Sequence, residues 1–192
     1  MAISAKFRNN GQVCISPNRF YIHESKKSEF TKLMVEKTTK LKMGNGMEKD
    51  TLLGPLTTKQ RLEGVEKLVE KTINEGGKLL TGGKRAANFN KGFFFEPTIF
   101  DEIKDNFTIM KEEPFGPIVP ILSFKSYDEV IKRANNNDLG LCSYVYTTDL
   151  KKANLASEEL ETGCVAVNTP AVAVAEAPFG GIKQTGYGRE GG

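Results

Sequence analysis

The sequence has little histidine and cysteine, and this scarcity excludes several kinds of site. His23 is the only histidine, which rules out a multi-histidine metal centre. The three cysteines, Cys14, Cys142 and Cys164, lie far apart and form no Cys-x-x-Cys pair. We therefore expect three free thiols, and neither a disulfide framework nor a zinc site. A dyad between Cys14 and His23 stays open at this stage.

Long apolar runs and charge clusters are missing too. No run approaches the roughly 20 residues that span a bilayer, and the first residues lack the apolar core of a signal peptide. The net charge of +3, from 27 basic and 24 acidic residues, is spread along the chain without a basic stripe. We expect a folded cytoplasmic protein that has neither a nucleic acid nor a membrane as a partner.

The composition is otherwise that of an ordinary globular protein. Hydrophobic residues make up 39% of the 192 positions and charged residues 27%. This length suffices for one sizeable α/β domain with a real core, whereas two full domains would be crowded.

Two amphipathic helices are predicted in the first half of the chain, after a short strand at residues 18–23. The first helix follows Ser25 and ends before residues 44–46, Gly-Asn-Gly. The second covers residues 57–75 and is followed by a pair of glycines that can cap it. The predicted apolar stripes are Phe30, Leu33, Met34 and Leu41 in the first helix, and Leu62, Val65, Leu68, Val69 and Ile73 in the second.

Strands and helices alternate in the second half. Ser126 with Glu129 forms a capping box and Asp149 is an acceptable N-cap, so two helix starts are encoded locally. The alternation predicts a parallel α/β sheet. The expected strands cover residues 117–124, 141–147 and 164–168, and the expected helices cover residues 126–136 and 149–160.

Two short segments have residue types suited to chemistry. Cys14 follows Gly-Gln-Val at a junction between a helix and a strand, where a loop can present a side chain into a cleft. A lone cysteine is nevertheless often a buried structural residue. Residues 112–117, Glu-Glu-Pro-Phe-Gly-Pro, could hold a carboxylate and a ring against a ligand, or form a solvated turn.

Together, the motifs resemble those of the aldehyde dehydrogenase superfamily, and of its succinate-semialdehyde dehydrogenases in particular. Residues 7–14, Phe-Arg-Asn-Asn-Gly-Gln-Val-Cys, resemble the nucleophile motif. Residues 112–117 resemble the Glu-Glu-x-Phe-Gly-Pro segment, and residues 178–190 resemble the C-terminal signature. The resemblance implies a three-layer α/β catalytic domain over residues 1–192, without the cofactor-binding domain and the C-terminal oligomerisation tail.

The resemblance also implies a reaction. The Cys14 thiolate would attack an aldehyde carbon to give a thiohemiacetal, hydride would pass to NAD or NADP, and water would hydrolyse the thioester. The Cys14 backbone N–H would hold the oxyanion, a contribution of ~3 to 4 kcal/mol. The dinucleotide turn and the Glu-Leu-Gly-Gly base of the family are expected before Met1. We therefore expect the isolated chain to be inactive, and the intact enzyme to be a homo-oligomer.

Further site residues follow from the same resemblance. Glu113 would accept hydrogen bonds from the nicotinamide ribose, and Phe115 would contact the nicotinamide end, whereas Glu112 is the weaker candidate. Phe179 matches an aromatic residue of the substrate pocket. Asn168 would shape the floor of the site. Each of these residues could instead serve only in the core.

Arg8 narrows the range of expected substrates. Succinate-semialdehyde dehydrogenases similarly have an arginine six residues before the nucleophile, where it binds the substrate carboxylate. Their usual serine is replaced here by Ala173, which favours a less polar pocket. Ser16 stands where some of these enzymes have a second cysteine, so no disulfide switch at Cys14 is expected. Another semialdehyde, a small hydroxyaldehyde, or a non-catalytic assembly module stays possible.

Overall fold

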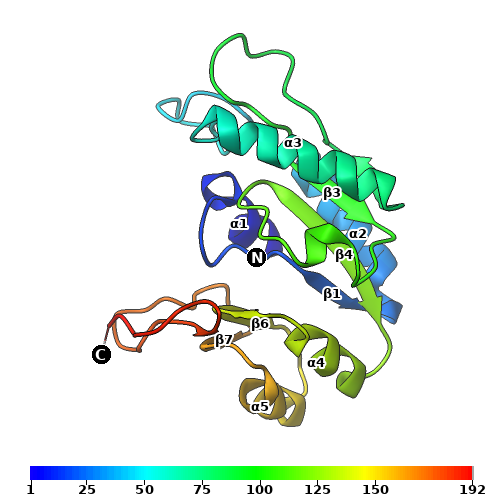
Figure 1. The fold of residues 1–192 in the computed structure, drawn as a ribbon, viewed down its shortest axis with the longest axis vertical. Helices are drawn as coiled ribbons and strands as arrows, with labels where there is room; N and C mark the ends of the chain where they lie inside the picture. The colour runs from blue at the N-terminus through cyan, green and yellow to red at the C-terminus, as the bar shows by residue number, and fades with distance from the viewer. Residues whose placement is uncertain (192) are drawn as a thin grey trace. The chain divides into compact units, whose positions relative to one another are not determined.

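A computed structural model describes residues 1–191 of the chain (Figure 1). It divides into two compact units, an N-terminal unit over Ala2–Phe124 and a C-terminal unit that begins at Lys125.

The N-terminal unit is built on a four-stranded sheet with the order β1-β4-β3-β2. Strands β1 and β3 both run parallel to the central strand β4, and β2 pairs antiparallel with β3 at one edge. The expected strand at residues 18–23 is confirmed, with its start two residues later. The four strands are β1 (Phe20–His23), β2 (Lys78–Thr81), β3 (Thr98–Asp101) and β4 (Ile118–Phe124).

Both faces of this sheet are buried. Along β4, Ile118 and Leu122 enter one hydrophobic cluster, whereas Val119 and Ile121 enter the other. This period of two is the side-chain alternation of a strand. Helices α1 (Ala2–Phe7) and α2 (Glu24–Thr39) supply residues to the cluster that holds Ile121, and α3 (Lys59–Asn74) supplies the opposite one. The three-layer α/β arrangement is thereby confirmed (Figure 1).

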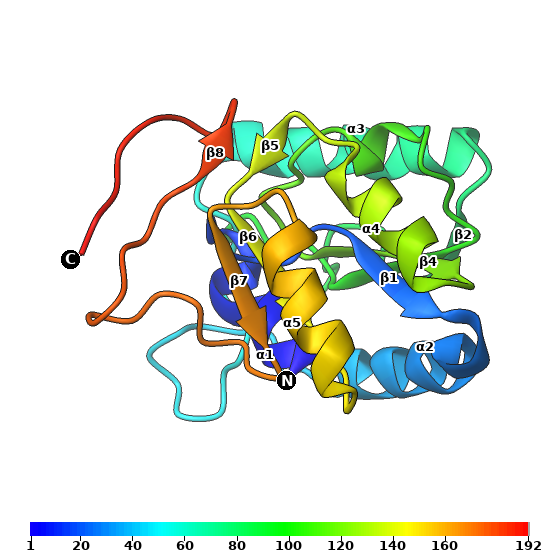
Figure 2. The ribbon, with the colours of Figure 1, turned by 90° about the horizontal axis from the view of Figure 1, so that it is seen from below.

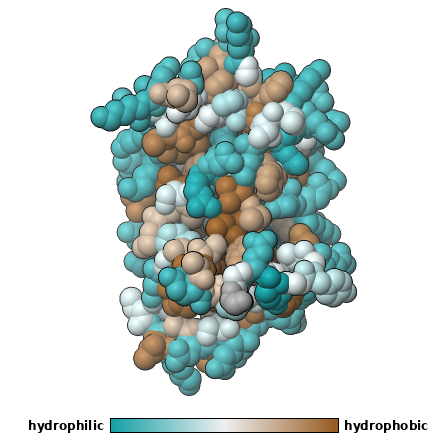
Figure 3. All heavy atoms as spheres, turned by 90° about the vertical axis from the view of Figure 1, so that its left-hand side faces the viewer, coloured by the Kyte–Doolittle hydropathy of each residue, from teal (hydrophilic) through white to brown (hydrophobic). Residues whose placement is uncertain are grey.

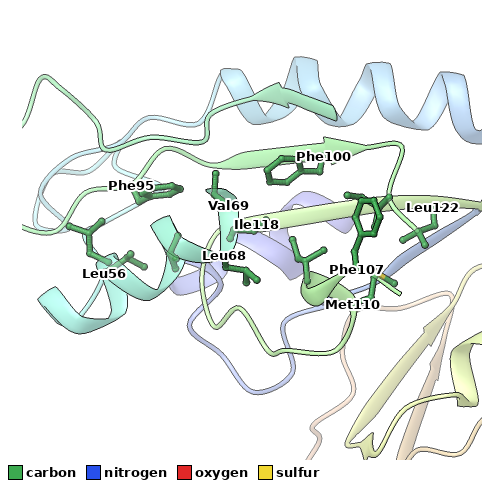
Figure 4. Close-up of a cluster of buried hydrophobic side chains, with 13 residues drawn as sticks. Leu56, Leu68, Val69, Phe95, Phe100, Phe107, Met110, Ile118 and Leu122 are labelled. Atoms are coloured by element: carbon green, nitrogen blue, oxygen red, sulfur yellow. The ribbon is translucent and has the colours of Figure 1, made fainter. Parts of the chain in front are cut away.

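Helix α3 covers its face of the sheet, as Figure 4 shows for Leu68 and Val69 beside Phe100 and Ile118. Thr58 caps the helix start, because its side chain accepts a hydrogen bond from the Arg61 backbone N–H at 3.1 Å.

Two residues of the predicted apolar stripes are exposed. In α3, Ile73 is 45% exposed, and Thr72 lies at the centre of the buried face with no exposed surface. Thr72 can be buried because its hydroxyl donates to the Leu68 carbonyl at 2.7 Å. Ile73 lies about 100° further round the helix and misses the sheet. In α2, Leu33 is 44% exposed while its neighbour Met34 is buried.

The C-terminal unit has the predicted alternation of strands and helices. Strand β6 (Cys142–Val145) runs parallel to β7 (Cys164–Val167), with Cys142 opposite Cys164. A second pair, β5 (Leu139–Gly140) and β8 (Ile182–Lys183), is antiparallel. Helices α4 (Tyr127–Asn135) and α5 (Leu150–Glu159) complete the unit (Figure 2).

The helix starts of the C-terminal unit follow the local sequence. Ser126 accepts from the Glu129 N–H at 3.3 Å, and Asp149 accepts from the Lys152 N–H at 3.1 Å. Both predicted N-caps are confirmed.

Hydrophilic residues cover much of the face drawn in Figure 3, with hydrophobic residues in small groups between them. Among residues 1–191, no helix has the length and apolar character needed to cross a membrane.

Candidate active site

The segment before Cys14 has an unusual backbone. A short 3-10 helix, η1 (Arg8–Gly11), follows α1 directly, and its last three residues, Asn9, Asn10 and Gly11, all have positive φ angles of 47°, 60° and 74°. Asparagine and glycine are the residues that tolerate this left-handed region. Non-glycine residues held there often mark functional sites.

Gly11 packs directly against the second motif of the sequence. A Cβ atom added at Gly11 would overlap the carbonyl oxygen of Gly116. Gly116 lies 105 positions away in the chain, within the Glu-Glu-Pro-Phe-Gly-Pro segment. The structure therefore brings residues 7–14 into contact with residues 112–117, and only glycine at position 11 permits this contact.

Two amides tie the loop to residues 54–57. The Asn10 side chain donates to the Gly54 carbonyl at 2.7 Å. The Gln12 side-chain oxygen accepts from both the backbone N–H and the hydroxyl of Thr57, at 2.9 and 3.0 Å. Asn10 and Gln12 are both buried, so these bonds are shielded from water. The loop that precedes Cys14 is therefore firmly anchored.

Cys14 itself lies in an exposed turn, whereas Cys142 and Cys164 are half-buried in strands. Within residues 1–191, no hydrogen bond holds the Cys14 thiol or its backbone N–H. The possible dyad with His23 is thus not formed. The His23 imidazole instead accepts from the Ser25 backbone N–H at 3.3 Å and caps α2.

Lys6 precedes the turn that contains Cys14, and its side chain is completely buried. Its ammonium group donates to the Asn18 side-chain oxygen at 3.2 Å, and its backbone carbonyl accepts from the Ser16 hydroxyl at 3.0 Å. Burial lowers the pKa of Lys6 from 10.5 to about 7, although the nearby Glu113 carboxylate acts in the opposite direction.

The Glu-Glu-Pro-Phe-Gly-Pro turn has a buried backbone and exposed acidic side chains. Pro114 and Gly116 are buried, while Glu113 is exposed and Phe115 is half-buried. Phe115 has a φ of 40°, another left-handed non-glycine residue.

Arg61 of α3 supports this turn. Its guanidinium lies 5.5 Å from the centroid of the Phe115 ring and donates to the Pro114 carbonyl at 3.5 Å. A cation over an aromatic face is attractive, and here it steadies the ring that the resemblance assigns to the cofactor.

Arg8 is exposed and forms no ion pair within residues 1–191. An arginine at this position could instead steady the loop by pairing with a protein carboxylate, but residues 1–191 contain no such pair for Arg8. Its guanidinium is free to meet an anion from outside.

The remaining candidate residues belong to the C-terminal unit. Asn168 has a φ of 57°, and its side chain bonds the backbone N–H and carbonyl of Thr147 at 3.0 and 2.9 Å. Both ends of its amide are thus used to join the segments that follow β6 and β7. Phe179 is half-buried and pairs through its backbone with Glu190, and Ala173 is exposed.

Sequence reasoning missed Lys6 and Arg61. Lys6 is the one residue with a charged side chain among the first seven, and that isolated charge is the one signal that could have marked it. Arg61 lies outside the apolar stripe of its helix, where a charged residue is ordinary. Their roles depend on contacts with residues distant in sequence.

An exposed cysteine on a loop locked against the Glu-Glu-Pro-Phe-Gly-Pro turn, within a three-layer α/β unit, is distinctive enough to define a class of protein. Comparison with known proteins identifies the class. The aldehyde dehydrogenase family model matches residues 1–192, so the chain belongs to the aldehyde dehydrogenase family.

Individual relatives agree with this assignment. The chain is 38% identical to a probable succinate-semialdehyde dehydrogenase [NADP(+)] of Sinorhizobium fredii, over 99% of this chain and 38% of the relative. It is 40% identical to a glutarate-semialdehyde dehydrogenase of Pseudomonas putida, over 99% of this chain and 39% of the relative. The NAD+ complex of a Bacillus cereus aldehyde dehydrogenase superposes with a TM-score of 0.96 at 40% identity, over 100% of this chain and 38% of that one. The chain thus spans about two fifths of the length of these proteins.

Proposed function

We propose that this chain supplies the cysteine-bearing catalytic domain of an NAD(P)-dependent aldehyde dehydrogenase, which oxidises an aldehyde with a second, anionic group to the carboxylic acid. Succinate semialdehyde is the first candidate substrate. The observation that carries the proposal is the exposed Cys14 on a loop locked against the turn that contains Glu113. The other three fifths of such an enzyme would supply the general base and the dinucleotide site.

Cys14 is the proposed nucleophile, and its exposed side chain is accessible to an aldehyde. Its thiolate would attack the aldehyde carbon, and the carbonyl electron pair would move to oxygen. The backbone N–H of Cys14, which no carbonyl of residues 1–191 engages, would donate to that oxyanion. Loss of hydride from the same carbon leaves a thioester on Cys14, and hydrolysis by water releases the acid and frees the thiol.

The Glu-Glu-Pro-Phe-Gly-Pro turn fits a nicotinamide cofactor. Glu113 presents an exposed carboxylate, which can accept from both hydroxyls of a ribose, and Phe115 offers a half-exposed ring that Arg61 holds. When bound, the cofactor would accept the hydride. The names of relatives include both NAD+ and NADP(+), so the proposal covers either form.

Arg8 is the residue proposed to meet the anionic group of the substrate. It is exposed, unpaired within residues 1–191 and six residues before Cys14. A guanidinium suits a carboxylate because it donates two parallel hydrogen bonds. Two relatives are named for semialdehydes that carry a carboxylate, one with four carbons and one with five, which supports this substrate class. In the C-terminal unit, Ala173 and Phe179 are proposed as substrate-binding residues, and Asn168 as a possible one.

Acylation of the chain by an activated ester, such as 4-nitrophenyl acetate, tests the nucleophile. This reaction requires attack on a carbonyl and an oxyanion, but no cofactor. We expect peptide mapping by mass spectrometry to find the acyl group on Cys14. Cys142→Ser and Cys164→Ser are the matched controls and should be acylated as fast as the parent chain. Acylation chiefly at Cys142 or Cys164 would sink the proposal, and an inert Cys14 would favour a non-catalytic assembly module.

A further inference from the structure

Lys6 is the one charged side chain among the buried residues of the described chain, and its exposure is 0%. A buried cation is costly for folding, and an apolar residue of similar volume is often neutral or stabilising in its place. Packing therefore gives no reason for a lysine at this position. Retention of such a group at a cost in stability is typical of a functional role.

Lys6 contacts residues on both sides of Cys14 in the sequence. Its side chain bonds Asn18, four residues after Cys14, and its carbonyl accepts from Ser16, two residues after Cys14. On the other side of Cys14, a side chain at Gly11 would press on the same carbonyl. One residue thus touches the cysteine loop both before and after Cys14.

Lys6 also interacts electrostatically with the Glu-Glu-Pro-Phe-Gly-Pro turn. Glu113 is the charged group that acts on Lys6, and its carboxylate favours the protonated amine. Asn18 and Ser16, the side chains bonded to Lys6, are uncharged. The electrostatic link therefore runs between Lys6 and Glu113, from the cysteine loop to the proposed cofactor turn.

We propose that Lys6 is a positioning residue, which fixes the cysteine loop through its hydrogen bonds with Asn18 and Ser16. The inference rests on the proposed function of Cys14. Its effect would be on the orientation of the Cys14 backbone N–H toward the oxyanion, and it requires no direct contact between Lys6 and the substrate.

Two reactions of Cys14 distinguish the correct orientation of its backbone N–H from the mere accessibility of its thiol. Acylation by 4-nitrophenyl acetate develops an oxyanion, whereas alkylation by iodoacetamide does not. In Lys6→Met we expect the acylation rate to fall at least tenfold and the alkylation rate to change less than threefold. Thr72→Val is the matched control, because it also replaces a completely buried polar residue of the same unit. That variant should leave the ratio of the two rates unchanged.

Asn18→Ala provides a second variant if Lys6→Met does not fold. Asn18→Ala should lower the ratio of the acylation rate to the alkylation rate. The double variant should have a ratio no lower than that of the single variants, because both substitutions break the same hydrogen bond between Lys6 and Asn18. An unchanged ratio in the two single variants would overturn the inference. If the parent chain is not acylated at Cys14 at all, the proposed function fails instead, so the two failures are distinct.

Discussion

Gly11 and Gly116 lie in direct backbone contact, although 104 residues separate them in the chain. Gly11 has a φ of 74° and faces the Gly116 carbonyl, and any side chain at position 11 would collide with that group. The contact joins the cysteine loop to the Glu-Glu-Pro-Phe-Gly-Pro turn, and it explains why the cysteine loop has a glycine at position 11.

Gly11→Ala should therefore disrupt the site. The new methyl group meets rigid backbone and the left-handed conformation is strained, so we expect a loss of at least ~2 kcal/mol in unfolding free energy. Urea denaturation measures the loss. Gly64→Ala is the matched control, since Gly64 lies inside α3 with no atom close enough to obstruct a Cβ. The control should gain about 0.5 to 1 kcal/mol from helix propensity. Equal stabilities for Gly11→Ala and the parent would show that the contact is loose.

The stability of the chain should depend on pH through Lys6. The folded-state pKa is about 7 and the ordinary value is 10.5, so between these values the unfolded chain binds one more proton than the folded chain. Stability must then rise with pH in this window, and the penalty for a buried charge is fully present below pH 7. From pH 7 to 9 the gain is about 2 kcal/mol.

The Lys6→Met variant has no titrating amine at position 6. Comparing the parent chain with this variant therefore separates the effect of Lys6 on stability from that of the other titrating groups. Relative to Lys6→Met, the parent chain should gain that amount in urea denaturation between pH 7 and 9. A difference between the two proteins that stays constant with pH would contradict the lowered pKa of Lys6.

Arg8→Ala should change substrate preference in a complete enzyme that contains this chain. A hydrogen bond to a charged group contributes ~1.5 to 3 kcal/mol, so kcat/KM for succinate semialdehyde should fall roughly tenfold to a hundredfold. A neutral aldehyde of similar length serves as the internal control and should lose much less. Equal losses for both aldehydes would mean that Arg8 steadies the loop instead of binding an anion.

The chain by itself should not reduce NAD or NADP when an aldehyde is added. Its sequence contains no Glu-Leu-Gly-Gly segment and no glycine-rich turn after a first strand, so the base and the main cofactor contacts of the family have no counterpart in it. Absorbance at 340 nm measures the reaction, and acylation at Cys14 in preference to the half-buried Cys142 and Cys164 in the same sample shows that the chain is folded. Measurable turnover would require a base and a cofactor site within residues 1–192.

Much of the fold could be predicted because its signals are local. The N-caps at Ser126 and Asp149 need only the residues of one helical turn, and the alternation of strands and helices follows from periodicity. The apolar stripe of α3 was right except at its end. Ile73 and Thr72 lie about 100° apart around the helix, and only Thr72 falls on the buried face, which no local pattern reveals.

The site divides in the same way between sequence and tertiary structure. The sequence by itself determined where the motifs lie and that Cys14, Glu113 and Arg8 are of the right type for cysteine-dependent aldehyde chemistry. Only the tertiary structure decided that Gly11 abuts Gly116 and that Lys6 is buried beside Asn18 with its charge coupled to Glu113. Contacts of that kind depend on how parallel strands bring distant loops to one edge of a sheet. Their energies come from burial and close packing, which exist only once the chain has folded.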